Sequence, residues 1–312
     1  MLTDRNFCVR FLFMMTFQQL MARFPDEDAC RKFLFERRWP DGVVHCPRCA
    51  KSETVYALKA FPWRWECSNP ECRSGNAYRF SLLVGTIFEN TKHPLVTWFK
   101  VLYTILQSKK GVSSRQIRRM FFGETSSLHT AWYMCHRLRA AMHDPDFKQL
   151  MGIVEVDETF IGGKDKNRHW NKKTHIKGGE MSNKTTVIGA ISRKGNVICK
   201  IIESTDTPTL DRFVRQAVAD KVSLVATDEH SGYRLLSPTY PHQAVRHGRG
   251  EYVRGEVHTN NIESFWALLK RGVIGTYHNV SKKYLPLYLA EFQFRHNNRN
   301  NPDMFGVVIA GS

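Results

Sequence analysis

The sequence lacks long apolar runs, internal repeats and low-complexity segments. None of its apolar stretches approaches the roughly 18–20 residues that a membrane-spanning helix needs. Residues 1–17 hold two arginines and a short apolar patch but no small-residue cleavage site, which argues against a signal peptide. The amphipathic pattern begins only near Met14 and Met15, so an alternative reading is that translation starts at one of them and that residues 1–14 are a misassigned start. We therefore expect a cytoplasmic protein.

Acidic side chains are also scarce relative to basic ones. The 312 residues contain 46 Lys and Arg against 29 Asp and Glu, a formal net charge of +17. Such an excess favours a polyanionic partner, most often nucleic acid, although a membrane surface or plain solubility are alternatives. With 42% hydrophobic residues, the chain has the composition of a globular protein and the length for two or three domains.

Cysteines are few, and half of them lie in one short segment. The segments "CPRC" and "CSNPEC" contain Cys46, Cys49, Cys67 and Cys72, whereas the other four are scattered. Two such pairs on tight turns predict a zinc ribbon with four thiolate ligands for Zn²⁺. Redox pairs or merely buried pairs are the alternative. A four-thiolate site has no open position, so this zinc would organise the fold and perform no chemistry. Several basic residues would give the ribbon a basic surface: Arg48, Lys51, Lys59, Arg64 and Arg73.

Helical periodicity dominates the first half of the chain outside this segment. Residues 16–38 alternate apolar and charged groups at helical spacing, with a break at Pro25 and Asp26 as the cap that follows it. Residues 94–107 are apolar nearly all round, which predicts a buried helix.

Residues 109–142 fit a helix-turn-helix. Ser113 or Ser114 can cap the first helix, Gly123 can turn the chain, and a second helix starts near Ser127. An ordinary helical hairpin with a solvated basic face is the alternative. The overall charge favours DNA contact through this pair, and the residues expected to make it are Arg115, Arg118, Arg119 and His129.

Beyond residue 148 the pattern changes to short β-rich runs. Strands are expected at 152–161, 185–192, 196–203 and 222–229, with a helix at 209–220 before the last strand. Two helices, near 260–271 and 283–298, close the chain. This order predicts an α/β domain.

Carboxylates interrupt two of these strands and begin one of the helices. Asp157 lies in "VEVDETFIGG", Asp228 ends another apolar run, and Glu263 lies near a helix start. Charge in a core is costly unless it is paired or metal-bound, and three converging carboxylates suit Mg²⁺ or Mn²⁺. Two ions roughly 4 Å apart could activate water or a 3′-hydroxyl for phosphodiester displacement. Lys270, about two helical turns from Glu263, would sit beside the phosphate.

Each acid also has a local alternative explanation. Asp157 and Asp228 could be turn residues at strand ends, and Glu263 could complete a capping box with Asn260. The neighbouring acids Glu155, Glu158 and Glu229 are alternative ligands.

Seven segments carry a resemblance to a known family. They are "CPRC…CSNPEC", "GTIFENTK", "TAWYMCHRLRAAM", "VEVDETFIGGK", "ATDEHSGY", "GEYVRGEVHTNNIESFWALLKRG" and "EFQFRHNNR". They extend from Met15 to about Arg299 and resemble bacterial insertion-sequence transposases of the DDE class with an N-terminal zinc ribbon, the ISXO2-like group. The resemblance implies an RNase H-like catalytic domain.

The same resemblance assigns the site residues. It implies that Asp157, Asp228 and Glu263 form the catalytic and metal-binding triad, with Lys270 as the associated basic residue. Some members of this group have Asn at the third position, so Asn260 or Asn261 could share that role.

Further DNA contacts are expected from a lysine-rich loop and from the segment around the third acid. The loop, residues 162–184, lies between glycine pairs and could grip phosphates, with a plain solvated loop as the alternative. The residues are Lys164, Lys166, Arg168, Lys172, Lys173, Arg249, Arg254 and Arg271.

These observations predict four regions: an N-terminal helical segment (1–42), a zinc ribbon (43–80), a helix-turn-helix region (81–147) and an RNase H-like domain (148–312). The predicted function is a DNA transposase that binds the terminal inverted repeats of its element, cleaves a strand and joins it to target DNA. Self-association as a dimer or larger assembly is expected, because two ends must be joined. A catalytically inert, zinc-dependent DNA-binding regulator is the alternative, and a stand-alone nuclease is a third reading.

Overall fold

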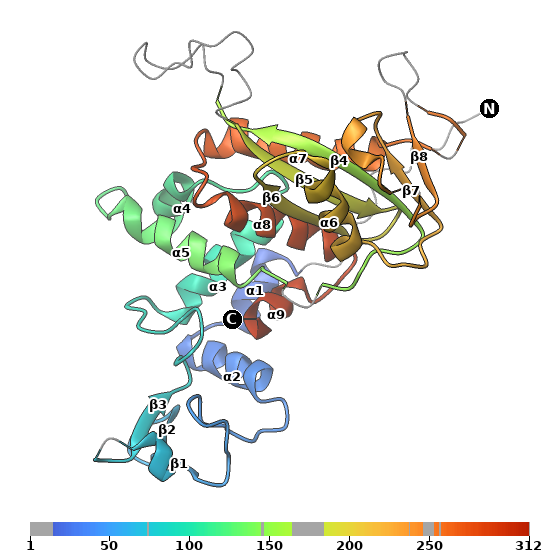
Figure 1. Ribbon diagram of the computed structural model, residues 1–312. Helices are drawn as coiled ribbons and strands as arrows, with labels where there is room; N and C mark the ends of the chain where they lie inside the picture. The colour runs from blue at the N-terminus through green and yellow to red at the C-terminus, as the bar shows by residue number, and fades with distance from the viewer. Residues whose placement is uncertain are drawn as a thin grey trace, which may run out of the picture. The chain divides into compact units, whose positions relative to one another are not determined.

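The computed structural model describes residues 15–73, 75–144, 147–163, 184–236, 238–245, 253–255 and 257–311. The chain forms two compact units (Figure 1): one runs up to Met142 and takes in the segment from Arg299 onward, and the other is His143–Asn298. No helix among the described residues is long and apolar enough to cross a membrane.

The first unit contains a small antiparallel sheet built around the cysteine pairs. Its strands are β1 (Val55–Ala57), β2 (Arg64–Cys67) and β3 (Tyr78–Ser81), in the order β1-β2-β3. A short 3₁₀ turn, η1 (Pro70–Cys72), brings the last cysteine back toward β2. Trp65 is buried in β2 and packs beside Trp39 and Phe80, with ring centroids 5.4 and 6.0 Å away.

The first unit also contains the helices α1 (Phe17–Arg23), α2 (Glu27–Arg38), α3 (Leu95–Gln107) and α9 (Met304–Ala310). An aromatic cluster joins these helices. The ring of Phe99 in α3 lies 4.9 Å from Phe24, the C-cap residue of α1, and 5.3 Å from Phe305 of α9, and Phe33 of α2 lies 6.2 Å from it, centroid to centroid. The predicted break at Pro25 is confirmed, and the Asp26 side chain accepts a hydrogen bond from the Ala29 N–H as the cap of α2.

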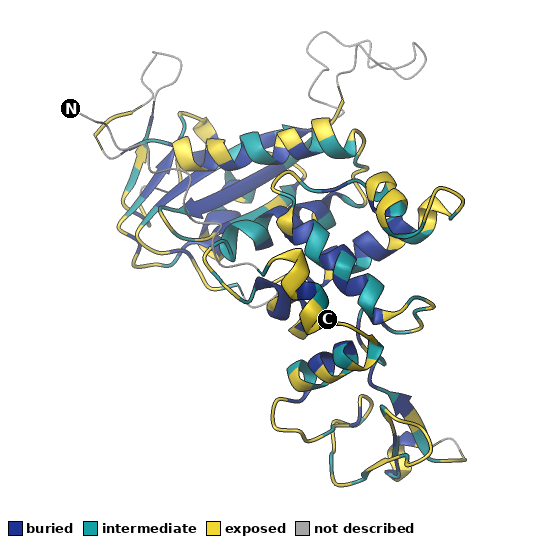
Figure 2. Cartoon of the chain, turned by 180° about the vertical axis from the view of Figure 1, so that it is seen from behind, coloured by how far each residue is buried: buried dark blue, intermediate teal, exposed yellow. Residues whose placement is uncertain are grey.

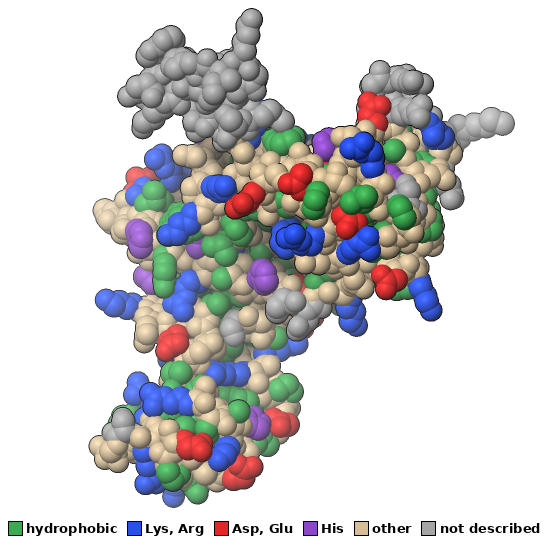
Figure 3. All heavy atoms as spheres, in the orientation of Figure 1, with side chains coloured by type: hydrophobic (Ala, Val, Ile, Leu, Met, Phe, Trp, Pro, Cys, Tyr) green, Lys and Arg blue, Asp and Glu red, His purple; other side chains and the backbone are tan. Residues whose placement is uncertain are grey.

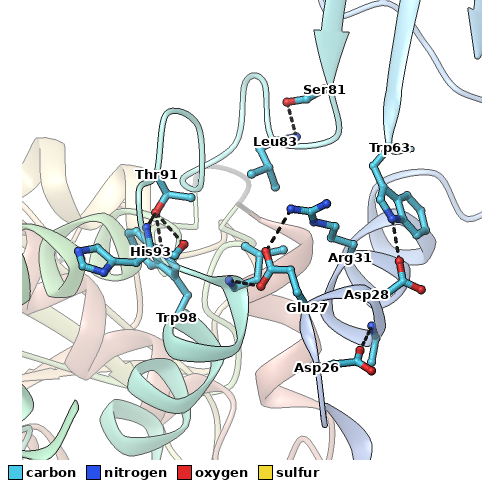
Figure 4. Close-up of polar contacts among 12 residues, drawn as sticks. Asp26, Glu27, Asp28, Arg31, Trp63, Ser81, Leu83, Thr91, His93 and Trp98 are labelled. Carbon is cyan, nitrogen blue, oxygen red and sulfur yellow. Dashed lines mark hydrogen bonds and ion pairs between the residues drawn. The ribbon is translucent and has the colours of Figure 1, made fainter. Parts of the chain in front are cut away.

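The first turn of α2 also supports its neighbours (Figure 4). Glu27 accepts the backbone N–H of Leu95 at 2.7 Å, which satisfies the first turn of α3, a helix with no side-chain cap of its own. Asp28 accepts the indole N–H of Trp63 at 2.9 Å. One helix start therefore ties α3 and the approach to β2 together.

The predicted helix pair is confirmed as α4 (Ser114–Phe121) and α5 (Leu128–Ala140). Ser113 and Ser127 cap them through hydrogen bonds to Gln116 N and His129 N. Gly123, with φ +77°, lies in the turn between them, where a side chain would strain the backbone.

The second unit is built on a five-stranded sheet in the order β6-β5-β4-β7-β8. β4 pairs antiparallel with β5 and parallel with β7, and β7 pairs parallel with β8. The bounds are β4 (Ile153–Ile161), β5 (Thr185–Ser192), β6 (Val197–Ile202), β7 (Leu224–Thr227) and β8 (His242–Ala244).

Helices cover both faces of this sheet, and the strands are among its most buried parts (Figure 2). On one face α6 (Thr207–Ala217) packs through Leu210, Phe213 and Val214 onto a cluster that includes Val154 and Val156. On the other, α7 (Asn260–Gly272) and α8 (Leu285–Asn297) enclose a second cluster. A 3₁₀ turn, η4 (Ser231–Tyr233), follows β7, and a π-helix, η6 (Val273–Tyr277), follows α7.

The structure differs from the sequence-based expectations in three elements. A third C-terminal helix, α9, follows the two that were predicted, so the prediction that two helices close the chain is wrong. Strands β3 and β8 were not anticipated, since each has only three or four residues. Residues 299–312, assigned by sequence to the last domain, group with the first unit.

Candidate functional site

Four cysteine sulfurs converge in the small sheet of the first unit. One ligand atom from each of Cys46, Cys49, Cys67 and Cys72 lies within 4.8 Å of the others. The Sγ atoms of Cys46 and Cys72 are 3.8 Å apart, and those of Cys49 and Cys67 are 3.9 Å apart. A tetrahedron with Zn–S bonds of about 2.3 Å has edges of about 3.8 Å, so the donor set fits zinc.

The surroundings of these cysteines already stabilise one thiolate. A hydrogen bond from the Asn69 side chain is the main cause that lowers the pKa of Cys49 to about 6. Burial raises the pKa of Cys72 to about 12, so this thiol would release its proton only to a bound metal. Arg48 closes the site, because its guanidinium donates to the Cys72 carbonyl and lies 3.7 Å from the Tyr78 ring centre.

In the second unit, strand register brings two of the predicted acids together. β4 and β7 run parallel with Glu155 opposite Ala226, so two residues further along Asp157 comes level with Asp228. Carboxylate oxygens of Asp157, Asp228 and the neighbouring Glu158 lie within 4.8 Å of one another. Hard divalent cations prefer such oxygen clusters.

The site is electrostatically unfavourable without a cation. Burial, then repulsion from Asp228, raises the pKa of Asp157 to about 6, and the charge of Glu263 acts in the same direction. Burial also raises the pKa of Glu158 to about 7, an effect that the Tyr233 hydroxyl partly offsets. Glu158 Oε1 is buried and makes no hydrogen bond of normal geometry in the described part of the chain. An oxygen in this position fits a metal ligand.

Glu263 lies at the margin of this cluster. It is exposed on the first turn of α7 and receives a hydrogen bond of 2.7 Å from the Thr259 hydroxyl. It is not among the three residues whose oxygens group within 4.8 Å, although its charge acts on Asp157. Asn260 is the first residue of α7 and Thr259 its N-cap, so the alternative capping box with Asn260 does not form. Lys270 is exposed on the same helix.

Glu155 is a carboxylate that is buried in the core. It is fully buried and accepts hydrogen bonds from Arg193 Nε, the backbone N–H groups of Asn261 and Ile262, and the Asn261 side chain. Asn261 is therefore engaged with Glu155. Glu229, the last of the alternative acids, is exposed.

The predicted DNA-contact residues that can be placed are mostly exposed. Arg115, Arg119 and His129 are exposed in the first unit, and Arg118 is half-buried. Arg254 and Arg271 are exposed in the second unit. Figure 3 shows Lys and Arg side chains distributed over each unit, including the ribbon. The remaining predicted contacts lie outside the described residues: Lys164, Lys166, Arg168, Lys172, Lys173 and Arg249.

A cavity of about 420 Å³ lies beside the start of α5. His129, Tyr133 and Arg137 of that helix line it, opposite the loop that contains Thr91 and His93. Arg137 fixes this loop by donating to the carbonyls of Thr86 and Glu89, at 3.3 and 2.9 Å. The start of α5 and the loop with Lys92 and His93 thus line one cavity.

The cysteine site and the acidic site both lie in segments that match models of known transposase domains. Residues 149–297 match the family model of the ISXO2-like transposase domain, and residues 25–75 match that of the transposase zinc-ribbon domain. Together the two matches cover more than half of the chain. The chain belongs to the ISXO2-like transposases. It is also 26% identical over 284 residues to an uncharacterised protein in transposable element ISH50 of Halobacterium salinarum, covering 87% of this chain and 91% of the relative.

The family matches follow the structure of this transposase closely. The transposase domain spans nearly all of the second unit, from just before β4 to the end of α8. The zinc-ribbon match begins at Pro25 and includes α2 as well as the four cysteines. The helix that supports the ribbon is thus part of the matched domain.

Sequence reasoning missed three contributors to the acidic site. Trp266 of α7 faces Asp157 and opposes the rise in its pKa, although its indole N–H makes no hydrogen bond of normal geometry to any residue that the structure describes. Thr259 holds Glu263, and Tyr233 faces Glu158. Thr259, just before the predicted helix, could have been found as a capping residue. The other two have no local signal, because tertiary packing alone brings them to the site.

Proposed function

We propose that this transposase binds the ends of its element and catalyses metal-dependent DNA strand cleavage and strand transfer. The observation that carries the proposal is the cluster of Asp157, Glu158 and Asp228 oxygens within 4.8 Å. These half-buried carboxylates repel one another, and a divalent cation would relieve that repulsion.

Asp157 and Asp228 would hold Mg²⁺ or Mn²⁺, with Glu263 as the third acid of the triad. Bound there, the metal would activate a water or 3′-hydroxyl nucleophile and stabilise the leaving oxygen. Lys270 would offer positive charge to the DNA from the same helix as Glu263. Asn261 is a weaker candidate ligand than the sequence indicated, because its side chain already donates to Glu155 at 2.7 Å. Glu158 becomes the more plausible additional ligand.

The RNase H-like fold is part of this proposal. A sheet with three antiparallel strands followed by parallel ones, helices on both faces, and acids on adjacent strands, Asp157 within β4 and Asp228 just after β7, supports it. Such an arrangement places the carboxylates beside the end of β7, where a DNA backbone could approach.

DNA binding would involve two parts of the first unit, the ribbon and the α4–α5 pair. The ribbon, organised by Zn²⁺, exposes Arg48, Lys51, Lys59, Arg64 and Arg73. The α4–α5 pair would act as a helix-turn-helix, with His129 near the exposed start of the second helix. Contacts to phosphates would make the affinity fall steeply with salt. Joining two element ends requires self-association as a dimer or larger assembly.

The test is Asp228→Asn in the full-length protein. This change keeps the size of the side chain and removes one charge from the cluster, so Mn²⁺-dependent strand transfer should fall by more than about 100-fold. DNA binding, measured by fluorescence anisotropy with the element's terminal repeats, should stay within about twofold. Strand transfer at the wild-type rate would contradict the proposal.

The same experiment separates the alternatives. A DNA-binding regulator without catalysis would give no strand transfer in the wild type either, while retaining specific binding. A stand-alone nuclease would cleave the repeats without joining them to a target.

A further inference from the structure

Helix α7 begins without a capping side chain of its own. Thr259 occupies the N-cap position, but its hydroxyl donates to Glu263 and accepts no hydrogen bond from the helix. The first-turn N–H groups of any helix need acceptors, and an N-cap side chain normally supplies one. For α7 the acceptor comes from elsewhere in the chain.

Glu155 of β4 supplies this acceptor. Its Oε2 accepts the N–H of Asn261 at 2.8 Å and that of Ile262 at 3.2 Å, the second and third residues of α7. Its Oε1 accepts from the Asn261 side chain at 2.7 Å and from Arg193 Nε at 3.0 Å. His258 Nδ1 lies 3.2 Å from the same oxygen. A strand residue thereby holds a helix start that is distant in sequence.

The charge of Glu155 matters as well as its shape. The carboxylate is fully buried, which is tolerable only because donors surround it and the positive end of the α7 dipole points at it. An isosteric amide would keep one acceptor, but in either orientation its NH₂ group would face N–H donors, those of the helix start or those of Arg193 and the Asn261 side chain. The first turn of α7 would then lose its anchor to the sheet.

That first turn carries Glu263, and Glu155 is two residues from Asp157 on the same face of β4. We propose that Glu155 is a positioning residue, which fixes the first turn of α7 and thereby sets Glu263 against the Asp157–Asp228 pair. This inference rests on the proposed metal-dependent function. Partners that orient metal ligands change metal affinity by roughly 10- to 100-fold when they are mutated.

The test compares Glu155→Gln with a matched control in the full-length protein. The control is Glu291→Gln, because Glu291 is also fully buried in the same unit and pairs with Arg295 at 3.0 Å, but it lies on α8. Binding of Mn²⁺ is measured by electron paramagnetic resonance of the free ion, at a temperature where circular dichroism shows both variants folded.

We expect Glu155→Gln to weaken Mn²⁺ binding by roughly 10- to 100-fold and to raise by a similar factor the Mn²⁺ concentration for half-maximal strand transfer. Glu291→Gln should stay within about twofold of the wild type in both measurements. Wild-type Mn²⁺ affinity in folded Glu155→Gln, or an equal loss in both variants, would overturn the inference. If Glu155→Gln does not fold, Glu155→Asp retains the charge but withdraws it by one methylene, and its Mn²⁺ affinity must fall several-fold.

Failure of the proposed function would look different. In that case wild-type protein and Asp228→Asn would bind Mn²⁺ equally, or neither would bind it. If only the positioning role is wrong, wild type and Asp228→Asn still differ while Glu155→Gln matches the wild type.

Discussion

Acidic residues on one strand serve two different purposes, and the partners of each decide which. Glu155 is surrounded by donors from α7 and by Arg193, so its charge stabilises the fold. Asp157 and Glu158 follow Glu155 by two and three residues and face other carboxylates, and burial raises the pKa of both. Of these three acidic residues, Glu155 has its hydrogen-bond partners within the protein, whereas Asp157 and Glu158 fit the role of cation ligands.

Metal binding at this cluster should depend on pH. The pKa is raised from 3.8 to about 6 for Asp157 and from 4.5 to about 7 for Glu158. An acid with a raised folded pKa stabilises the metal-free fold below its unfolded pKa, and this contribution is lost as pH rises through the folded value. A cation must displace these protons, so its affinity should increase through this window and level off above about pH 7.

The measurement is the rise in melting temperature caused by Mn²⁺, recorded at several pH values from about 5 to 8. We expect the rise to be small at the acid end and to grow with pH until both carboxyls are ionised. Asp228→Asn supplies the control, because it should flatten the dependence. An Mn²⁺ effect that is the same at both ends of the range would count against the cluster as the binding site.

At the scale of elements, two helices of this protein obtain a capping group from another part of the chain. Glu27 of α2 accepts the first N–H of α3, and Glu155 of β4 accepts two N–H groups of α7. Neither helix has a side-chain cap of its own. Each contact fixes where a helix starts relative to its neighbour, which local capping would not do.

The packing of α7 on the sheet depends on the absence of a side chain at Gly189. This residue of β5 lies opposite Asp157, and a Cβ placed there would come within 2.6 Å of the Trp266 ring. Trp266 is buried and faces Asp157. Gly189→Ala should therefore displace the indole and reduce the free energy of unfolding by roughly 1–3 kcal/mol, as overpacking does.

Urea denaturation monitored by circular dichroism checks this prediction, and the matched control is Gly275→Ala. A Cβ at Gly275 meets nothing within 4 Å, so the control should be neutral or slightly stabilising. Equal stability of Gly189→Ala and the wild type would show that α7 can shift without cost.

At the scale of the whole molecule, the chain leaves its first unit near Met142 and returns to it at Arg299. The returning helix, α9, adds Phe305 to the aromatic cluster of Phe24, Phe33 and Phe99. The helical part of the first unit is thus completed by residues that follow the whole transposase domain. Truncation at the end of that domain would remove part of the core of the other unit.

Phe305→Ala should destabilise the first unit selectively. The side chain is 4% exposed, and removal of a buried phenyl ring typically costs about 3–5 kcal/mol. Hydrogen exchange followed by mass spectrometry should show lost protection in α2 and α3, with protection in β4 and β5 retained. Val307→Ala, at an exposed position of the same helix, should change neither. Loss of protection spread equally over both units would contradict the assignment.

The sequence by itself determined what depends on spacing along the chain. The cysteine pairs, the cap at Asp26, a serine cap at Ser113 or Ser114, the helix start near Ser127, and most strands and helices follow from local patterns, and the structure confirms them, with Ser113 as the cap. It also pointed to Asp157 and Asp228, because acids within or just after apolar runs stand out locally. Short strands such as β8 escaped because three residues carry too little periodicity.

Only the tertiary structure decided which of the acids meet. The parallel register of β4 and β7 brings Asp157 level with Asp228. Glu155 accepts hydrogen bonds from the start of α7, and Glu263 lies at the margin of the cluster. Likewise, Trp266, Tyr233 and α9 reach their places through packing between segments distant in sequence. Such contacts depend on the register of strands and the docking of helices, which residue spacing within a single segment does not encode.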